Sequence, residues 1–152
     1  MKLITTLLLC FLPLMSKNIY FTQSSSSIDE LEAKIISQIA NAFLHKPQIY
    51  IVGRNTQLSK YLAKYSNVKS SCHEANFVYI KKTSKDFKAL DKCDKTNTVF
   101  FTDDKNKFKK NLNIIGAFFW LKSRPNVQLS LKRAQKLKIK IPENYSKFVD
   151  NQ

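Results

Sequence analysis

The segment QIYIVGRNTQLSKYL (48–62) decides the fold class of this chain. Its first five residues are rich in β-branched and aromatic side chains, Gly53 follows them, and Leu58, Tyr61 and Leu62 then recur at helical spacing. A strand, a turn and a helix in this order form the repeating unit of α/β proteins. A single glycine is not a dinucleotide-binding fingerprint, which needs three glycines at fixed spacing.

Two further units of the same kind follow along the chain. The runs NFVYI (76–80) and TVFF (98–101) predict two more strands. A short helix is predicted over 84–90 after the first run, and another helix begins at Asp103 and Asp104 after the second. This alternation predicts mostly parallel central strands joined by right-handed crossovers.

The flanking segments complete the expected domain. Upstream, Ser27 opens a capping box with Glu30, and the helix that follows carries an apolar stripe made of Ile28, Leu31, Ile35, Ile39 and Phe43. Downstream, IIGAFFWL (114–121) and NVQLSL (126–131) predict an antiparallel hairpin joined by residues 122–125, and a last helix is predicted over 143–149.

We therefore expect a single α/β domain over residues 28–150. Its architecture is predicted to be a Rossmann-like three-layer sandwich with mainly parallel central strands and a C-terminal antiparallel hairpin. The sequence shows no internal repeat and no linker that would divide it.

The N-terminus is typical of a signal peptide over residues 1–16. Lys2 supplies a positive start, and an apolar run over 3–14 follows that is short for a membrane span of about 20 residues. A membrane anchor, or a lipoprotein signal around Cys10, is the alternative. Residues 17–27 are polar and rich in serine, which predicts a flexible tether. We expect a periplasmic protein from which the signal peptide has been removed.

Removal of that segment leaves two cysteines, Cys72 and Cys93. An even pair in an exported chain suggests a disulfide, and the alternative is two separate buried thiols. The neighbouring His73 is not expected to form a catalytic pair with Cys72, because adjacent residues on a strand point to opposite faces. No catalytic residues and no cofactor are predicted.

No metal site is predicted either. Two cysteines and two histidines show no zinc-ligand spacing. Asp103 and Asp104 follow a strand end, where a metal could bind, but two acids at a helix start are typical of caps.

The net charge of +15 points to an anionic partner, since 26 basic residues face 11 acidic ones. Nearly all of this charge is lysine, which lacks the planar fork that reads phosphates or bases. An exported protein also meets little nucleic acid, so no nucleic-acid partner is expected. An acidic protein or anionic lipid headgroups remain as partners. The alternative is a compositional bias that leaves the lysine-rich stretches 105–110 and 132–140 as solvated faces.

The hairpin is the first candidate for a contact surface. The consecutive aromatic residues Phe118, Phe119 and Trp120 are more than one strand face can bury, although packing in the core is the alternative. The predicted partner-binding residues are Phe119, Trp120, Arg124, Lys132, Arg133 and Lys136.

The order of these segments resembles that of the YfiR-like periplasmic regulators. The similar segments are AKIISQIANAF (33–43), IYIVGRNTQLSKYL (49–62), SCHEANFVYI (71–80), TVFFTDD (98–104), IIGAFFW (114–120) and the closing stretch 126–149. Within them, Cys72 matches a cysteine position of the family.

The resemblance implies a non-enzymatic regulator. It would bind the periplasmic domain of an inner-membrane sensor, typically a diguanylate cyclase that makes cyclic di-GMP, and hold that enzyme inactive. It also implies that a disulfide sets the stability of the regulator and couples it to envelope redox state. A binding module for a small or polyanionic envelope ligand is the alternative function. The oligomeric state is left open.

Overall fold

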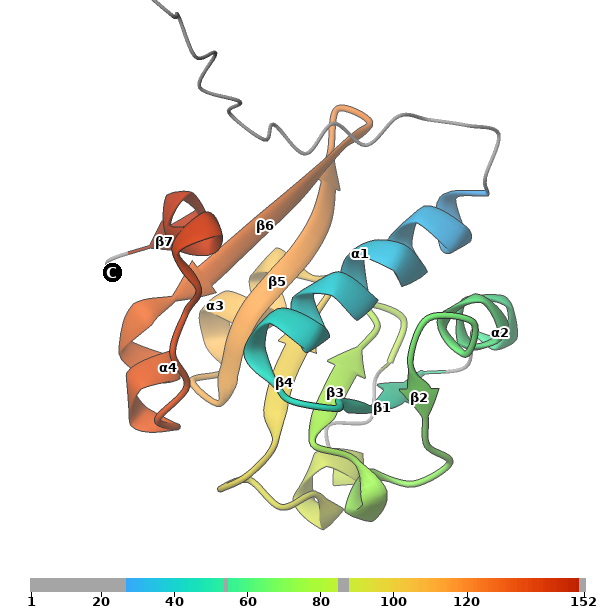
Figure 1. The fold of residues 1–152 in the computed structure, drawn as a ribbon, viewed down its shortest axis with the longest axis horizontal. Coiled ribbons are helices and arrows are strands. Elements are labelled where there is room, and N and C mark those ends of the chain that lie inside the picture. The colour runs from blue at the N-terminus through green and yellow to red at the C-terminus, as the bar shows by residue number, and fades with distance from the viewer. Residues whose placement is uncertain (1–26, 54, 85–87, 151–152) are drawn as a thin grey trace, which may run out of the picture.

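The computed structural model describes residues 27–53, 55–84 and 88–150. They form one seven-stranded sheet in the order β2-β1-β3-β4-β5-β6-β7, drawn in Figure 1. The strands are β1 (Gln48–Val52), β2 (Asn67–Val68), β3 (Phe77–Ile80), β4 (Val99–Thr102), β5 (Ile114–Leu121), β6 (Arg124–Ser130) and β7 (Val149–Asp150). The pairs from β2 to β5 are parallel, and β5 with β6 is antiparallel. The predicted fold class is confirmed.

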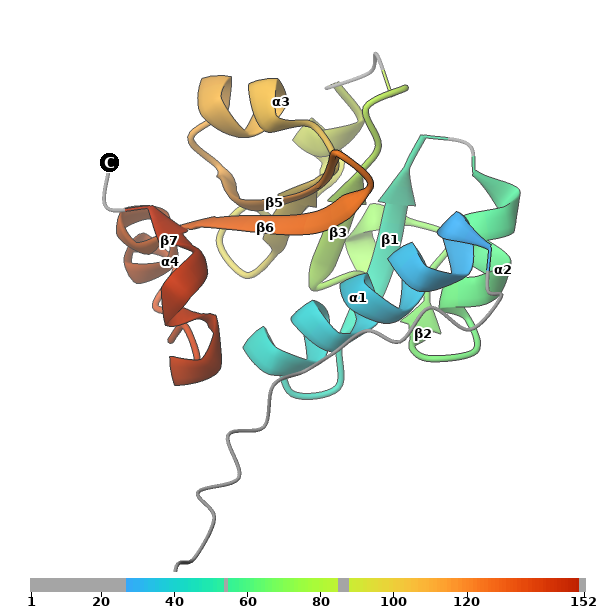
Figure 2. The same ribbon diagram turned by 90° about the horizontal axis from the view of Figure 1, so that it is seen from above.

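Helices cover both faces of this sheet. The α-helices are α1 (Ile28–Phe43), α2 (Thr56–Leu62), α3 (Lys105–Lys110) and α4 (Leu131–Lys136), and the 3-10 turns are η1 (Cys72–Glu74), η2 (Lys88–Lys92) and η3 (Glu143–Phe148). Figure 2 shows α1 and α2 on one face and α3 on the other. Within the described residues, no helix is long and apolar enough to cross a membrane. The predicted signal peptide (1–16) and residues 17–26 of the predicted tether lie outside the described residues.

The central strands are apolar on both faces, because each face is covered. All four residues of β3 and all four of β4 are buried. Phe77 and Tyr79 of β3 pack on the α1 side, whereas Val78 and Ile80 pack on the α3 side. A strand buried between two layers needs such a continuous apolar run rather than alternation.

The hairpin is tighter than predicted. Leu121 pairs with Arg124, so the turn consists only of Lys122 (φ +48°) and Ser123 (φ +60°). Two positive φ angles define the turn type whose twist matches a two-residue hairpin. The predicted four-residue connection over 122–125 is therefore wrong, and Pro125 lies inside β6 opposite Trp120.

Three other predicted elements differ from the structure. The last helix, predicted over 143–149, is the 3-10 turn η3, and Val149 pairs with Leu129 to begin β7. In α1, Ile28 of the predicted stripe is 69% exposed, whereas Ile36, which lies outside that stripe, is fully buried. The buried face of α1 is wider than predicted because the helix packs against both the sheet and α2. The helix predicted over 84–90 lies partly outside the described residues, and the turn η2 occupies 88–92.

Candidate functional site

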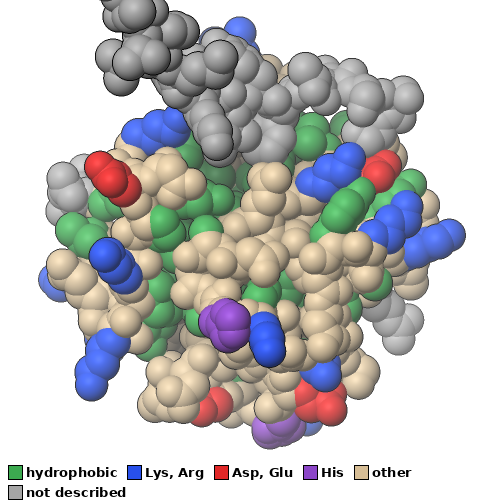
Figure 3. All heavy atoms as spheres, in the orientation of Figure 1, with side chains coloured by type: hydrophobic (Ala, Val, Ile, Leu, Met, Phe, Trp, Pro, Cys, Tyr) green, Lys and Arg blue, Asp and Glu red, His purple; other side chains and the backbone are tan. Residues whose placement is uncertain are grey.

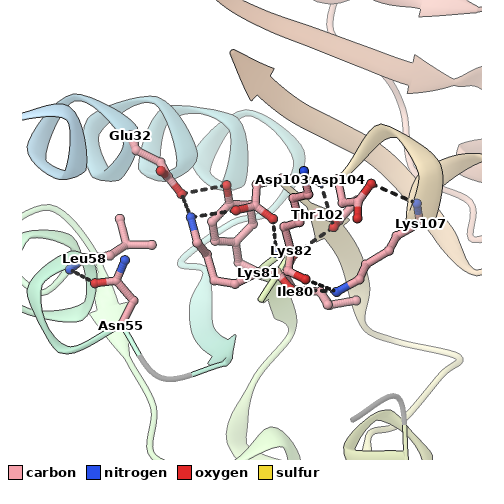
Figure 4. A network of polar contacts seen from close by, with 11 residues as sticks. Glu32, Asn55, Leu58, Ile80, Lys81, Lys82, Thr102, Asp103, Asp104 and Lys107 are labelled. Atoms are coloured by element: carbon pink, nitrogen blue, oxygen red, sulfur yellow. Dashed lines mark hydrogen bonds and ion pairs between the residues drawn. The ribbon is translucent and has the colours of Figure 1, made fainter. Parts of the chain in front are cut away.

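Four side chains form an ionic cluster where β3 and β4 end: Glu32, Tyr79, Lys81 and Asp103. Lys81 Nζ lies 2.5 Å from Glu32 Oε1 and 2.7 Å from Asp103 Oδ2. Tyr79 donates its hydroxyl proton to the same Glu32 oxygen at 2.8 Å. Figure 4 shows Lys81 held between the two carboxylates. The side chains of Lys81, Glu32 and Asp103 are 11%, 6% and 17% exposed, so both ion pairs are largely shielded from water.

The fold brings these residues together from three elements. Glu32 lies on α1, Lys81 follows β3, and Asp103 follows β4. Parallel strands present their carboxyl ends at one edge of the sheet, and β3 and β4 are neighbours in it. Asp103 also accepts a hydrogen bond from the backbone N–H of Lys82. The cluster therefore cross-links α1 to the ends of two central strands.

The protonation states of Lys81 and Tyr79 indicate that this cluster has a structural role. Burial disfavours the charge on Lys81, but the carboxylates of Glu32 and Asp103 outweigh it and raise the pKa of Lys81. Burial, reinforced by the same carboxylates, raises the pKa of Tyr79 well above its ordinary value. At neutral pH Lys81 is thus an ammonium ion and Tyr79 a neutral phenol, and neither is available as a nucleophile.

The neighbouring loops are also held by side chains of this chain (Figure 4). Asp104 caps α3 by accepting from the backbone N–H groups of Asn106 at 2.8 Å and Lys107 at 3.4 Å, as predicted for an acid at a helix start, and Figure 4 draws the contact with Lys107. Lys107 Nζ donates at 2.6–3.0 Å to three backbone carbonyl groups after β3, those of Lys81, Lys82 and Ser84. This edge of the sheet, where open α/β folds often bind ligands, is occupied by internal contacts. Among the described residues, no cluster of three or more acids, histidines or cysteines is placed to hold a metal ion.

The structure pairs Cys72 with Cys93, with their Cα atoms 5.2 Å apart. Both cysteines are buried in the core on the α3 side of the sheet. They join the segments that precede β3 and β4. Cys72 lies in the turn η1, not in the strand, which begins only at Phe77, and the adjacent His73 is exposed.

The predicted aromatic contact residues lie on opposite faces of the hairpin. Phe119 is half-buried on the α3 side, with Lys105 Nζ 5.5 Å from its ring centroid. Trp120 is half-buried on the α1 side, where its ring meets Phe118 edge-on at 5.5 Å. Its indole Nε1 is buried and has no hydrogen-bond partner in the described part of the chain. Each ring thus covers part of a core and leaves part at the surface.

The four predicted basic residues divide into two groups. Arg124, Lys132 and Lys136 are exposed. Arg133 instead donates from one guanidinium nitrogen to three backbone carbonyl groups at 2.7–3.0 Å, those of Phe108, Asn111 and Ile114. Burial lowers the pKa of this guanidinium. Arg133 therefore holds the connection between α3 and β5, and the other three residues remain at the surface.

A groove of about 120 Å³ between α1, β6 and η3 was not predicted. Its lining residues are Ile35, Gln38 and Ile39 of α1, Pro125 and Val127 of β6, and Asn144, Tyr145, Lys147 and Phe148 of η3. In the space-filling view of Figure 3, hydrophobic side chains reach the surface of this face in scattered patches, and basic side chains lie among and around them. Helical spacing in the sequence indicates the apolar residues of α1 and of η3 separately, but only tertiary packing shows that they face one another.

No protein-family model matches this chain, and no curated protein matches it.

Proposed function

We propose that this chain is a periplasmic regulator that acts by binding a protein and not by turnover. Its partner is the periplasmic domain of an inner-membrane sensor of the diguanylate cyclase type, which it represses. The observation that carries this proposal is the excess of positive charge at the C-terminal end of the fold. Residues 121–150 include eight basic and two acidic residues, a net charge of +6.

We define the C-terminal basic surface as the exposed residues Lys122, Arg124, Lys132 and Lys136. The ion pairs between described residues are those of Lys34, Lys81 and Lys95, so none involves this surface. An acidic domain would compensate this charge and would be steered towards it by the long-range field. Anionic headgroups at the membrane beside such a sensor would add to the same attraction.

Two further features support the proposal. A disulfide persists in oxidising compartments such as the periplasm, and the structure holds Cys72 and Cys93 at disulfide distance. At the carboxyl ends of β3 and β4, Lys81 is paired with Glu32 and Asp103 inside the fold, which supports a structural role for this cluster and binding at another surface. Both features favour an exported binding protein.

The test is a tagged pull-down from solubilised envelopes with three proteins: the wild type, the charge-reversed variant Arg124→Glu/Lys132→Glu/Lys136→Glu, and the control Lys60→Glu/Lys92→Glu/Lys109→Glu. The control changes the net charge equally at exposed positions on α2, η2 and α3. We expect the wild type and the control to retain one inner-membrane sensor protein and the charge-reversed variant to lose it. Recovery of no sensor by the wild type, or equal loss in both variants, would overturn the proposal.

A further inference from the structure

We infer that the groove between α1, β6 and η3 receives one aromatic or branched aliphatic side chain from an acidic segment of the partner protein. The inference rests on the proposed function, because the partner is the one that the C-terminal basic surface attracts. It adds the place where the partner inserts an anchoring residue.

The groove offers an apolar floor with an aromatic wall. Ile35 and Ile39 of α1 are almost fully buried, and Val127 of β6 is half-buried beside them. Tyr145 and Phe148 form the wall on η3, with ring centroids 6.1 Å apart. An apolar side chain placed against this floor and wall would be transferred from water to an apolar environment.

The volume of the groove limits the size of the group that it can bind. Small-molecule sites are clefts of roughly 300–1,000 Å³, whereas this groove measures about 120 Å³. A cavity of about 150 Å³ holds one benzene molecule, so this slightly smaller groove has room for no more than one ring or branched aliphatic group. Single buried anchors of this kind, aromatic ones above all, supply much of the affinity of protein interfaces.

The charged groups around the groove favour acidic residues on either side of the partner's inserted side chain. Among the described residues that line the groove, Lys147 is the only charged one and none is acidic. The exposed Arg124 of the C-terminal basic surface directly precedes Pro125 of the groove in the chain and adds a second positive charge on the same strand. Opposite Pro125 stands Trp120, whose buried Nε1 lacks an acceptor among the described residues.

The experiment is an NMR titration of the purified exported chain with the blocked dipeptide acetyl-Phe-Glu-amide and its neutral counterpart acetyl-Phe-Gln-amide. We expect saturable shifts at Ile35, Val127 and Phe148, with the Glu form binding about 2–5-fold more tightly at low salt, as expected for an exposed charge pair. Lys147→Gln should remove this preference and keep binding of the neutral dipeptide. Shifts confined to other surfaces, or no saturable shift, would overturn the inference.

Two matched variants guard against a general loss of structure. Gln38 and Asn41 are both exposed on α1, but only Gln38 lines the groove. Gln38→Trp should fill the groove and weaken dipeptide binding at least about tenfold, whereas Asn41→Trp should not. Equal effects of the two would refute the groove, and so would a dimer in solution that only Gln38→Trp dissociates, because a second copy would then be the occupant.

The two proposals fail separately. Capture of a sensor in the pull-down without dipeptide binding would refute the groove and leave the regulator. Dipeptide binding in the groove without any captured sensor would refute the regulator and leave a peptide-anchoring site.

Discussion

Replacing Lys81 by methionine tests whether the ionic cluster holds α1 to the sheet. The ammonium group contacts two carboxylates whose side chains are only 6% and 17% exposed. Without it, Glu32 keeps one hydrogen bond from Tyr79 and Asp103 keeps one from the N–H of Lys82. Removing one partner of a buried ion pair costs about 3–5 kcal/mol. Because Asp103 retains some contact with water, we expect the lower end, about 3 kcal/mol.

The assay is urea unfolding followed by the fluorescence of Trp120, the single tryptophan of the chain. The midpoint should fall while the slope of the free energy against urea stays constant, since the surface exposed on unfolding is unchanged. The double variant Glu32→Gln/Lys81→Met removes the stranded carboxylate and should recover about 2 kcal/mol of the loss. Lys95→Met, which breaks the exposed pair with Asp91, should leave the midpoint unchanged.

An unchanged midpoint in Lys81→Met would refute this reasoning. It would mean that α1 is held by apolar packing alone, and that the two carboxylates find enough water or hydrogen bonds without the lysine. The same outcome would mean that the cluster does not hold α1, and with it the floor of the groove, in place.

Three other predictions concern the core, the disulfide and the pH dependence of the ionic cluster. Gly116→Ala should lower the free energy of unfolding by about 1–3 kcal/mol, because a Cβ there would overlap the ring of Phe101 and stand 2.7 Å from Leu129 Cδ2; an unchanged urea midpoint would contradict this packing. Cys72→Ala should cost about 3 kcal/mol, since the bond closes a loop with a sequence separation of 21; equal thermal midpoints with and without reductant would show that the wild-type bond adds no stability. The free energy of unfolding should also fall above about pH 10. Because the pKa values of Lys81 and Tyr79 are raised in the folded state, the folded protein keeps two protons that the unfolded chain releases once the pH passes the unfolded pKa values. The free energy of unfolding then decreases by at most about 1.4 kcal/mol per pH unit for each group. Urea midpoints at about pH 8 and about pH 11 should therefore differ less in Tyr79→Phe than in the wild type, and identical differences would contradict the assignment.

The parts of the fold that the sequence predicts are those with strong local signals. The buried runs of β3 and β4 read directly as strands because both of their faces are apolar. The Ser27 cap is also local, since its hydroxyl accepts the N–H of Glu30 three residues on. The two-residue hairpin was missed because its turn is Lys122-Ser123 and not one of the glycine-containing pairs that usually mark such turns.

The candidate site was harder to predict because its contacts join distant parts of the chain. Glu32 and Lys81 are 49 residues apart, and Glu32 lies in a helix where an acidic residue ordinarily faces water. In the sequence, Arg133 and its neighbour Lys132 are both basic residues of one lysine-rich stretch. In the structure, however, Arg133 donates hydrogen bonds to three backbone carbonyl groups. Local spacing cannot separate a buried donor from a solvated one when the acceptors come from another element.

The central claim, that this protein represses a diguanylate cyclase by binding its periplasmic domain, is tested most directly by measuring cellular cyclic di-GMP. Deleting the gene should raise the level, and restoring the wild-type protein should lower it again. The charge-reversed variant Arg124→Glu/Lys132→Glu/Lys136→Glu, exported in equal amount, should fail to lower it. An unchanged level on deletion, or full restoration by the charge-reversed variant, would contradict the account.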